Sequence, residues 1–510
     1  MKHYKEEDKF FRIHLKWLLL LFFAQIFHKK VVFWGASLFL NDFLNKYKLH
    51  LSSIIGVIDK NIYKTNKDFC GYKIINPIEI DNIKPDYIIF AIKNNHKRIY
   101  QEVKLNLQLS DYKCALLKND FIGLEQECSK LNNSKIEQLN DIINKLAPQK
   151  AVYIFQCGFF DQNGKDFYAG GAERYALDLA ALISYLGYKP ILIQAGNQDS
   201  DKPWVTNMQD LTVIGVNAQG SNYFKIITGL KEPALAIYSG ILEWETNLNY
   251  KNALLLSHGI TWDNPRVNAE CEFLQTILKT FNNIISVDTN TISWFRSTFS
   301  NYIFNKNIDF QYVPNYVDIE KYKPVSQKRR TQLKITFPRR CTEERGFWMF
   351  ADIVPDILKA YKDVTIEFVG YVHTDEIKNK LKELITNYPD NIIHQVCSQD
   401  KMFEVYQNTD ISIIPTLCSE GTSLACLEAM ACGNTVIATN IGGLTNLIIN
   451  DYNGKLINPD KHSLYSAIME VIENENLRNY LSENAIALSK SFSKRVWERK
   501  WLNILSKYLK

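Results

Sequence analysis

The sequence predicts an α/β protein made of several units in which helices cover parallel strands. Short, nearly continuous apolar runs alternate with helix-length segments along most of the chain, as in sheets that are buried on both faces. At 510 residues the chain is too long for one ordinary domain. Hydrophobic residues make up 46% of it, which is enough for sizeable cores and excludes a wholly disordered protein.

Charge and cysteine content exclude further classes. The 60 basic and 55 acidic side chains give a net charge of +5, which is modest for this length and predicts no nucleic-acid partner. The 10 cysteines are scattered, without a CxxC pair or a Cys/His cluster at zinc spacing. They are typical of reduced thiols in a cytoplasmic protein rather than of a metal site or a disulfide framework.

The first segment, residues 1–30, carries an apolar run at Trp17–Phe27 between basic residues. As a helix this run would be about 16 Å long, against roughly 30 Å of bilayer hydrocarbon, so it cannot span a membrane. Acidic residues precede it and no small-residue cleavage site follows, which disfavours a secretory signal. Two interpretations stay open. The run is either a helix in the membrane interface, on the cytoplasmic face of an inner membrane, or a helix that packs within the protein or against another chain.

Residues 31–148 predict a small parallel α/β domain. Apolar strands are expected in VVFW after Lys30, at Ile54–Asp59 and at Asp86–Ile92. The segment resembles the Rossmann-like domains that are fused to sugar-modifying enzymes. Only Gly35 stands where a dinucleotide-binding turn has three glycines, so the alternatives are a cofactor site and a docking or regulatory domain. The charged helical stretch Glu125–Lys145 is expected to be the linker to the next domain.

Two larger α/β units follow, at residues 149–325 and 326–490, and a last helix lies in residues 491–510. Strands of the first unit are expected in the runs AVYIFQCG, PILIQAG, LTVIGV, ALAIYSG, ALLLSHG, NIISVDT and QYVPNYVD. Strands of the second are expected in LKITFP, VTIEFVG, NIIHQVC, DISIIP and TVIATN. Two such domains side by side make a cleft, and the polar stretch Tyr322–Thr331 is the expected hinge.

The most informative stretch follows the strand Asp410–Pro415, where Glu420 and Glu428 stand eight positions apart. The helix after this strand is expected to open with three small residues, Gly421, Thr422 and Ser423. Free backbone N–H groups at such a strand-to-helix crevice favour an anionic, phosphate-bearing ligand. Eight residues are slightly more than two helical turns, so both carboxylates are expected on one face, at opposite ends of an elongated ligand.

The run Ser419–Pro459 resembles the donor-sugar half of the GT-B retaining glycosyltransferases of family 4, whose mark is two glutamates in E(x7)E spacing. The resemblance extends over roughly Ala151–Lys510. It implies a GT-B fold of two Rossmann-like domains facing a cleft, here preceded by the third, small Rossmann-like domain. The first unit would be the acceptor domain, the second the donor domain, and the terminal helix would return onto the acceptor domain. Glu428 would bind the ribose of a nucleoside diphosphate sugar, and Glu420 would contact the transferred hexose.

Two arginines, Arg340 and Arg345, follow the strand Leu333–Pro338 and precede a glycine. Two cations beside a diphosphate leaving group stabilise the transition state more than the ground state. The family carries an arginine here and, five residues on, a lysine, so Arg345 keeps the charge but changes its geometry. Arg339 could exchange roles with Arg340. The alternative is a solvated basic loop.

Two further features are expected at the cleft. Gly170 and Gly171 stand directly before a helix, where they would let the backbone approach a ligand closely. They match the family's GG loop, which borders the diphosphate and the acceptor. His258 ends the strand Ala253–Ser257, at the sheet edge where ligands bind. The family often has a histidine here that contacts the transferred sugar; the alternative is a histidine satisfied by neighbouring backbone.

The chain also contains the triplet Asp199-Ser200-Asp201, which spells the DxD motif of metal-dependent enzymes. Its surroundings have the composition of an exposed loop. We therefore expect no metal and no other cofactor, with the helix dipole and the arginines in place of a cation.

The predicted function is transfer of a hexose, with retention, from a nucleotide-sugar donor to a glycan or lipid-linked glycan acceptor in the biosynthesis of cell-surface polysaccharide or lipopolysaccharide. Two alternatives stay open, a hydrolysing sugar-nucleotide epimerase of the same fold and a non-catalytic sugar-nucleotide-binding module. The base, the sugar and the linkage are not encoded in any motif that we can interpret.

Overall fold

The computed structural model describes most of the chain from residue 133 onward and short stretches before it. The described residues are 21, 25, 30–34, 40, 43–45, 51–58, 68–75, 87–90, 133–147, 150–156, 158–168, 170–240, 250–260, 277–325 and 332–509. Most of the apolar run Trp17–Phe27 lies outside them. So do Gly35 and the last residue of the predicted strand Ile54–Asp59. Within this part of the chain, no helix has the length and apolar character needed to cross a membrane.

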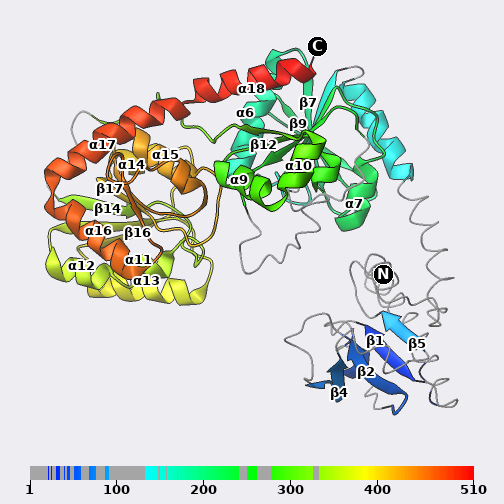
Figure 1. Cartoon of the computed structure of the whole chain (residues 1–510), viewed down its shortest axis with the longest axis horizontal. Coiled ribbons are helices and arrows are strands. Elements are labelled where there is room, and N and C mark those ends of the chain that lie inside the picture. Colours follow the sequence, from blue (N-terminus) through cyan, green and yellow to red (C-terminus); the bar gives the residue numbers. More distant parts are fainter. Residues whose placement is uncertain are drawn as a thin grey trace. The chain divides into compact units, whose positions relative to one another are not determined.

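The chain divides into two compact units, Met1–Leu131 and Asn132–Lys510. The first contains a sheet with the order β3-β4-β2-β1-β5, parallel except for the β3–β4 pair (Figure 1). Its strands are β1 (Val31–Trp34), β2 (Ile54–Ile58), β3 (Asp68–Phe69), β4 (Tyr72–Ile75) and β5 (Tyr87–Phe90). Three of them lie within the predicted apolar runs. They are apolar throughout because, as in β1, successive side chains of both faces are buried.

The second unit begins with an eight-stranded sheet in the order β13-β12-β11-β10-β6-β7-β9-β8, parallel except for β8 (Figure 1). Its strands are β6 (Ala151–Phe155), β7 (Lys189–Ala195), β8 (Trp204–Met208), β9 (Leu211–Val216), β10 (Leu235–Ser239), β11 (Ala253–Ser257), β12 (Asn283–Ser286) and β13 (Asp309–Tyr312). Its helices are α6 (Gly171–Tyr185), α7 (Gly220–Ile227), α9 (Thr289–Thr298) and α10 (Ser300–Lys306). Each predicted run contains at least part of a strand, but β13 begins at Asp309 and shares only Gln311 and Tyr312 with the run QYVPNYVD. The strand β8 is added as an antiparallel edge.

One segment differs from its prediction. Residues 133–146, expected to belong to the linker, form a helix that packs onto this sheet, with Leu139 and Ile143 fully buried in its core. Further apolar side chains at Ile136, Ile142 and Leu146 pack against the same core. Apolar residues at spacings of three and four give a helix one apolar face, and that face is buried here rather than left in solvent.

A second sheet has the order β16-β15-β14-β17-β18-β19 and is parallel throughout. Its strands are β14 (Leu333–Phe337), β15 (Val364–Val369), β16 (Ile392–Gln395), β17 (Ile411–Ile414), β18 (Thr435–Thr439) and β19 (Lys455–Ile457). Its helices are α11 (Phe347–Ala351), α12 (Val354–Ala360), α13 (Asp375–Asn387), α14 (Met402–Gln407), α15 (Leu424–Ala431), α16 (Lys461–Glu473) and α17 (Glu475–Ser489). We call residues 133–316 the first domain and 317–489 the second domain.

The last helix, α18 (Lys494–Tyr508), follows the second domain but packs on the first. Trp497, Trp501 and Leu505 are buried in the same core as the inner face of α6. The indole N–H of Trp501 donates a hydrogen bond of 2.6 Å to the hydroxyl of Tyr175, and Lys494 pairs with Asp178 at 2.6 Å. The helix thus ties the end of the chain to α6, beside which it runs in Figure 1.

Candidate functional site

The two domains of the second unit touch where their parallel strands end. His258 and Gly259 follow β11, and Glu420 and Gly421 follow β17. A Cβ atom on Gly421 would lie 2.5 Å from the carbonyl oxygen of His258, and one on Gly259 would lie 2.8 Å from the Cα of Gly421. Gly259 also has a φ of +118°, which other residues rarely adopt. Glycine at both positions is what lets these loops meet, and the candidate site lies around this contact.

Glu420 is held by two guanidinium groups of its own domain. Arg339 Nη2 donates to both carboxylate oxygens at 3.0 Å, Arg345 Nη1 forms an ion pair with Oε2, and the Thr416 hydroxyl donates at 2.9 Å. Burial acts to raise the pKa of this carboxyl group, but the charges of Arg339 and Arg345 outweigh it and the pKa lies below its ordinary value. Glu420 is therefore a carboxylate at neutral pH.

The arginine beside Glu420 differs from the predicted one. Arg339 has a side chain only 8% exposed and contacts the carboxylate, whereas Arg340, the predicted partner of Arg345, is exposed. Both arginines lie in the loop after β14, which ends at Phe337, and there the chain turns Arg339 and not Arg340 toward Glu420. Arg340 lies instead near Glu173 of the first domain. Burial raises the pKa of the Glu173 carboxyl group above its ordinary value, and Arg340 is one of the groups that oppose this rise.

Glu428 lies in the second turn of α15 and is almost fully buried. Its Oε1 accepts a hydrogen bond of 3.0 Å from Nη1 of Arg174, which belongs to the first turn of α6. The two predicted glutamates thus have separate cationic partners, one from each domain. Arg174 was not among the predicted site residues, although its place three residues after Gly171 in an opening turn was a signal that it could reach the same crevice.

The glycine pair lies where the two helices begin. Gly170 precedes α6 as its N-terminal cap and Gly171 is its first residue. A Cβ on Gly171 would lie 3.0 Å from Cδ1 of Leu424, the first residue of α15. The N-termini of α6 and α15 are therefore close together, and each is the positive end of a helix dipole. At α6 the Glu173 carboxylate accepts hydrogen bonds from the backbone N–H groups of Gly170 and Glu173.

Thr422 and Ser423 are both buried at the start of α15. The Thr422 hydroxyl donates to the carbonyl of Val287 at 2.9 Å and accepts from the backbone N–H of Asn315 at 2.7 Å. This hydroxyl is used to join the two domains. If Thr422 contacts the donor, as predicted, it must do so through its backbone. Ser423 is the N-terminal cap of α15, and its side chain makes no capping hydrogen bond.

His258 points into the first domain. Its Nε2 lies 2.8 Å from the hydroxyl oxygen of Ser239, and its ring meets that of Tyr175 edge-on at 5.5 Å. Burial lowers the pKa of the imidazole to about 4, so it is neutral at neutral pH. The alternative interpretation expected His258 to be satisfied by neighbouring backbone. The hydrogen-bond partner that the structure shows is the side chain of Ser239.

The Asp199-Ser200-Asp201 triplet lies in a turn after β7, with both aspartates exposed. The backbone N–H of Asp199 donates to Oδ1 of Asn197 at 3.0 Å, as is typical of a local turn. In the part of the chain that the structure describes, no three His, Cys, Asp or Glu side chains are grouped so that they could hold a metal ion.

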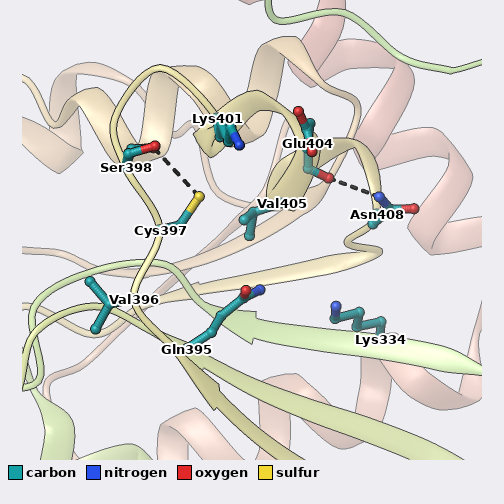
Figure 2. A pocket seen from close by; sticks show the side chains of 9 residues that line it. All are labelled: Lys334, Gln395, Val396, Cys397, Ser398, Lys401, Glu404, Val405 and Asn408. Atoms are coloured by element: carbon teal, nitrogen blue, oxygen red, sulfur yellow. Dashed lines mark hydrogen bonds between the residues drawn. The ribbon is translucent and has the colours of Figure 1, made fainter.

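A pocket of 520 Å³ lies in the second domain between α14 and the strands β14 and β16 (Figure 2). Its lining residues are Lys334, Gln395, Val396, Cys397, Ser398, Lys401, Glu404, Val405 and Asn408. Near it, Lys334 forms an ion pair of 2.8 Å with the buried Glu367, which also accepts a hydrogen bond from Gln395. None of the predicted site residues lines it. Its lining residues come from separate elements, so no local sequence motif could predict it.

Comparison with known proteins finds family matches in two parts of the chain. Residues 318–488 match the family described as glycosyl transferases group 1, and residues 27–115 match the family described as C2185-like, N-terminal. An uncharacterised glycosyltransferase of Methanocaldococcus jannaschii is 28% identical over 200 residues, 36% of this chain and 48% of that protein.

A second curated relative is the N,N'-diacetylbacillosaminyl-diphospho-undecaprenol alpha-1,3-N-acetylgalactosaminyltransferase of Campylobacter jejuni. It is 26% identical over 119 residues, 23% of this chain and 31% of that enzyme. The chain thus spans less than half the length of these curated relatives.

Solved structures resemble the chain over both domains. Sucrose-phosphate synthase from Thermosynechococcus elongatus has a TM-score of 0.57 at 14% identity, covering 70% of this chain and 99% of its own. Anabaena HepE in complex with UDP has a TM-score of 0.52 at 16% identity, covering 70% of this chain and 100% of its own. Identities this low show the fold alone, and they confirm the predicted GT-B architecture.

Proposed function

We propose, for a chain whose residues 318–488 are a domain of the glycosyl transferases group 1 family, that it transfers a hexose from a nucleoside diphosphate sugar to a glycan acceptor. One observation carries the proposal. Two carboxylates, of the buried Glu428 and the partly buried Glu420, lie with three arginines and the N-termini of two helices around the contact between the loops after β11 and β17. These groups are drawn from both domains. The cationic groups in this set suit the diphosphate of a nucleotide sugar, and the carboxylates suit its hydroxyl groups.

Each group has a role in the proposed reaction. Glu428 accepts hydrogen bonds from the ribose hydroxyls, while the helix N-termini and the guanidinium groups face the diphosphate. Arg345 is the more exposed arginine, with a side chain 26% exposed and one contact to Glu420. It is the group free to turn toward the diphosphate. Arg339, at 8% exposure with contacts to Glu420 and Thr416, holds the carboxylate in place.

The transfer itself exchanges two bonds at the anomeric carbon of the donor. The bond from this carbon to the diphosphate oxygen breaks, the bond to the acceptor oxygen forms on the same face, and the acceptor proton passes to a departing phosphate oxygen. The arginines stabilise the charge that grows on the leaving group, which lowers the barrier. No divalent cation is needed for that task. His258 is a weak base with its pKa near 4, so its role is to hydrogen-bond the hexose rather than to take the proton.

The acceptor class follows from the relatives. The name of the Campylobacter jejuni relative places a sugar on a lipid-linked diphosphate, and this supports a lipid-linked glycan as the acceptor here. We place the reaction in the synthesis of a cell-surface polysaccharide or lipopolysaccharide, at the cytoplasmic face of the membrane. UDP in the Anabaena neighbour supports a uridine nucleotide as the first donor to try.

The test uses the full-length chain with a panel of UDP-, GDP- and ADP-hexoses, and a lipid-linked glycan acceptor in detergent. We expect nucleotide release and product with one donor, retention of anomeric configuration by NMR, and activity that persists in EDTA. Glu428→Gln should raise the donor KM, and Glu420→Gln should lower kcat by at least about 100-fold. Binding of no donor by the folded protein would overturn the proposal. Turnover of donor without acceptor would favour the epimerase, and binding without turnover a non-catalytic module.

A further inference from the structure

In the described part of the chain, Arg174 is the residue of the first domain that forms an ion pair with a predicted site glutamate. Its Nη1 lies 3.0 Å from Oε1 of Glu428, which is 254 positions away in the sequence. The exposed fractions are 24% for the arginine side chain and 8% for the glutamate. The carboxylate is thus nearly withdrawn from water, and the guanidinium group is partly so, which makes the geometry of the pair matter.

The surroundings hold the arginine in this direction. Its guanidinium group lies over the ring of Tyr316 at 6.0 Å from the ring centre, close enough for a cation–π contact. The buried Tyr322 lies beside the pair: burial raises the pKa of its hydroxyl first, and the charge of Glu428 raises it further. Burial alone would lower the pKa of Arg174, but Glu428 outweighs it and raises the pKa. The cation is permanent.

The backbone brings the two side chains within reach. Gly171 allows α6 to begin against Leu424, so the first turn of α6 faces the first turns of α15. The neighbouring Glu173 stays on its own helix, where its carboxylate occupies the space that a Cβ on Gly170 would need. Of the two adjacent charged residues, only Arg174 reaches the ribose-binding candidate.

We propose that Arg174 is a positioning residue for Glu428, fixing one carboxylate oxygen so that the other accepts hydrogen bonds from the donor ribose. The inference rests on the proposed function, because it assigns Glu428 to the ribose. It adds that nucleotide recognition is shared between the two domains: the second domain supplies the carboxylate, and the first domain orients it. Donor binding thereby depends on the contact between the two domains that brings Arg174 to Glu428.

The discriminating readout is the preference for ribose over 2′-deoxyribose. A hydrogen bond to a charged group contributes about 1.5–3 kcal/mol, or roughly 10- to 100-fold in affinity. If Arg174 orients Glu428, replacing it removes this preference while leaving contacts to the base and the diphosphate in place. A merely structural ion pair would change both affinities together or only the stability of the fold.

The experiment measures the Kd of the full-length protein for UDP, GDP and ADP by calorimetry, and then the Kd of the tightest of them against its 2′-deoxy counterpart. Wild type should prefer the ribonucleotide by at least about 10-fold. In Arg174→Gln this ratio should fall to about 3 or less, and in Arg174→Lys, which keeps the charge but loses the planar fork, it should lie between. Lys494→Gln is the matched control, since it removes another ion pair of α6, with Asp178, and should keep the wild-type ratio.

The outcomes separate the inference from the proposed function. A wild-type protein that binds none of the three nucleotides would sink both. A wild-type ratio retained in Arg174→Gln, or an equal loss for both nucleotides, would overturn the inference alone. If the thermal transition shows that Arg174→Gln is unfolded, the ratio in Arg174→Lys decides: a ratio below wild type supports the positioning role, and an unchanged ratio contradicts it.

Discussion

At the scale of the residue, the site depends on which of two adjacent arginines faces the interior. The Arg339 side chain is 8% exposed and shares Glu420 with Arg345, while Arg340 is exposed and lies near Glu173 of the first domain. Removing Arg339 leaves the carboxylate of Glu420 with a single cationic partner, Arg345, which costs more than removing an exposed charge. The two arginines are therefore expected to respond very differently to the same substitution.

The Arg339→Ala variant should lose about 3–5 kcal/mol of stability in the transition of the second domain, and most of its transfer activity, because Glu420 keeps only Arg345 and Thr416. The Arg340→Ala variant should stay within about 0.5 kcal/mol of wild type. Urea denaturation and donor turnover measure both. Equal effects of the two substitutions would contradict the assignment of Arg339 as the partner of Glu420.

His258 makes stability depend on pH in a defined direction. Its pKa is about 4 in the folded protein, against an ordinary value of 6.5. As pH falls through this window the unfolded chain takes up a proton that the folded chain refuses, so unfolding becomes easier, by about 3 kcal/mol at most. In His258→Asn this contribution is absent. The stability advantage of wild type over the variant should therefore shrink as pH falls from 6.5 to 4, in urea titrations across the window. A difference independent of pH would show that the imidazole is not buried as described.

At the scale of the element, the site exists because loops at the ends of β11 and β17 come into backbone contact. Gly421 has no side chain at the point where a Cβ would meet the His258 carbonyl at 2.5 Å. Backbone cannot yield as a flexible side chain can, so an added methyl group must push the loops apart. The same separation would move Glu420 away from His258. The part of the site in the second domain would then no longer face the part in the first domain.

Gly421→Ala is thus expected to destabilise the protein by about 1–3 kcal/mol and to weaken nucleotide binding. Gly158→Ala is a suitable control from the same cleft region, because a Cβ there would meet only the ring of Tyr168, at an ordinary 3.7 Å. Thermal denaturation and calorimetric titration with nucleotide give the two readouts. If the Gly421 variant behaved like the Gly158 variant, the loops would not be in contact in solution.

At the scale of the whole molecule, α18 connects the end of the second domain to the core of the first. Trp501 is fully buried there and donates its indole N–H to Tyr175 of α6, the helix that also carries Arg174. Trp497 packs edge-on against Tyr175 at 5.0 Å. The position of α6, and through it the Arg174–Glu428 pair, therefore depends on a helix that is more than 300 residues away in the sequence.

Trp501→Ala should cost about 3–5 kcal/mol, because it leaves a large cavity between α18 and α6. The exposed Arg495 on the same helix provides the control, and its replacement by alanine should change stability by no more than about 0.5 kcal/mol. Denaturation followed by intrinsic fluorescence reports the loss, and nucleotide affinity should fall with it. A Trp501 variant as stable as the Arg495 variant would mean that α18 does not pack on α6.

Much of the fold was readable from local patterns. Strands of a parallel sheet covered on both faces are apolar at nearly every position, so VVFW, AVYIF or ISII can be recognised without any knowledge of their neighbours. The spacing of Glu420 and Glu428 is likewise a local property. The expectation that the helix opens at Gly421 and carries both carboxylates on one face was wrong, because α15 begins at Leu424 and Glu420 lies in the loop before it. The helix at residues 133–146 was predicted as helical, but whether its apolar face is free or covered depends on a partner that the segment does not contain.

The sequence by itself determined the α/β class, the strands and the two glutamates, because these follow from periodicity and spacing over a few residues. Only the tertiary structure decided that Arg339 rather than Arg340 meets Glu420, that the Thr422 hydroxyl joins the domains, and that Arg174 meets Glu428. The physical reason is that the direction of a side chain, and the partner it finds, depend on backbone brought together across 254 positions of the chain. A local pattern carries no information about that distance.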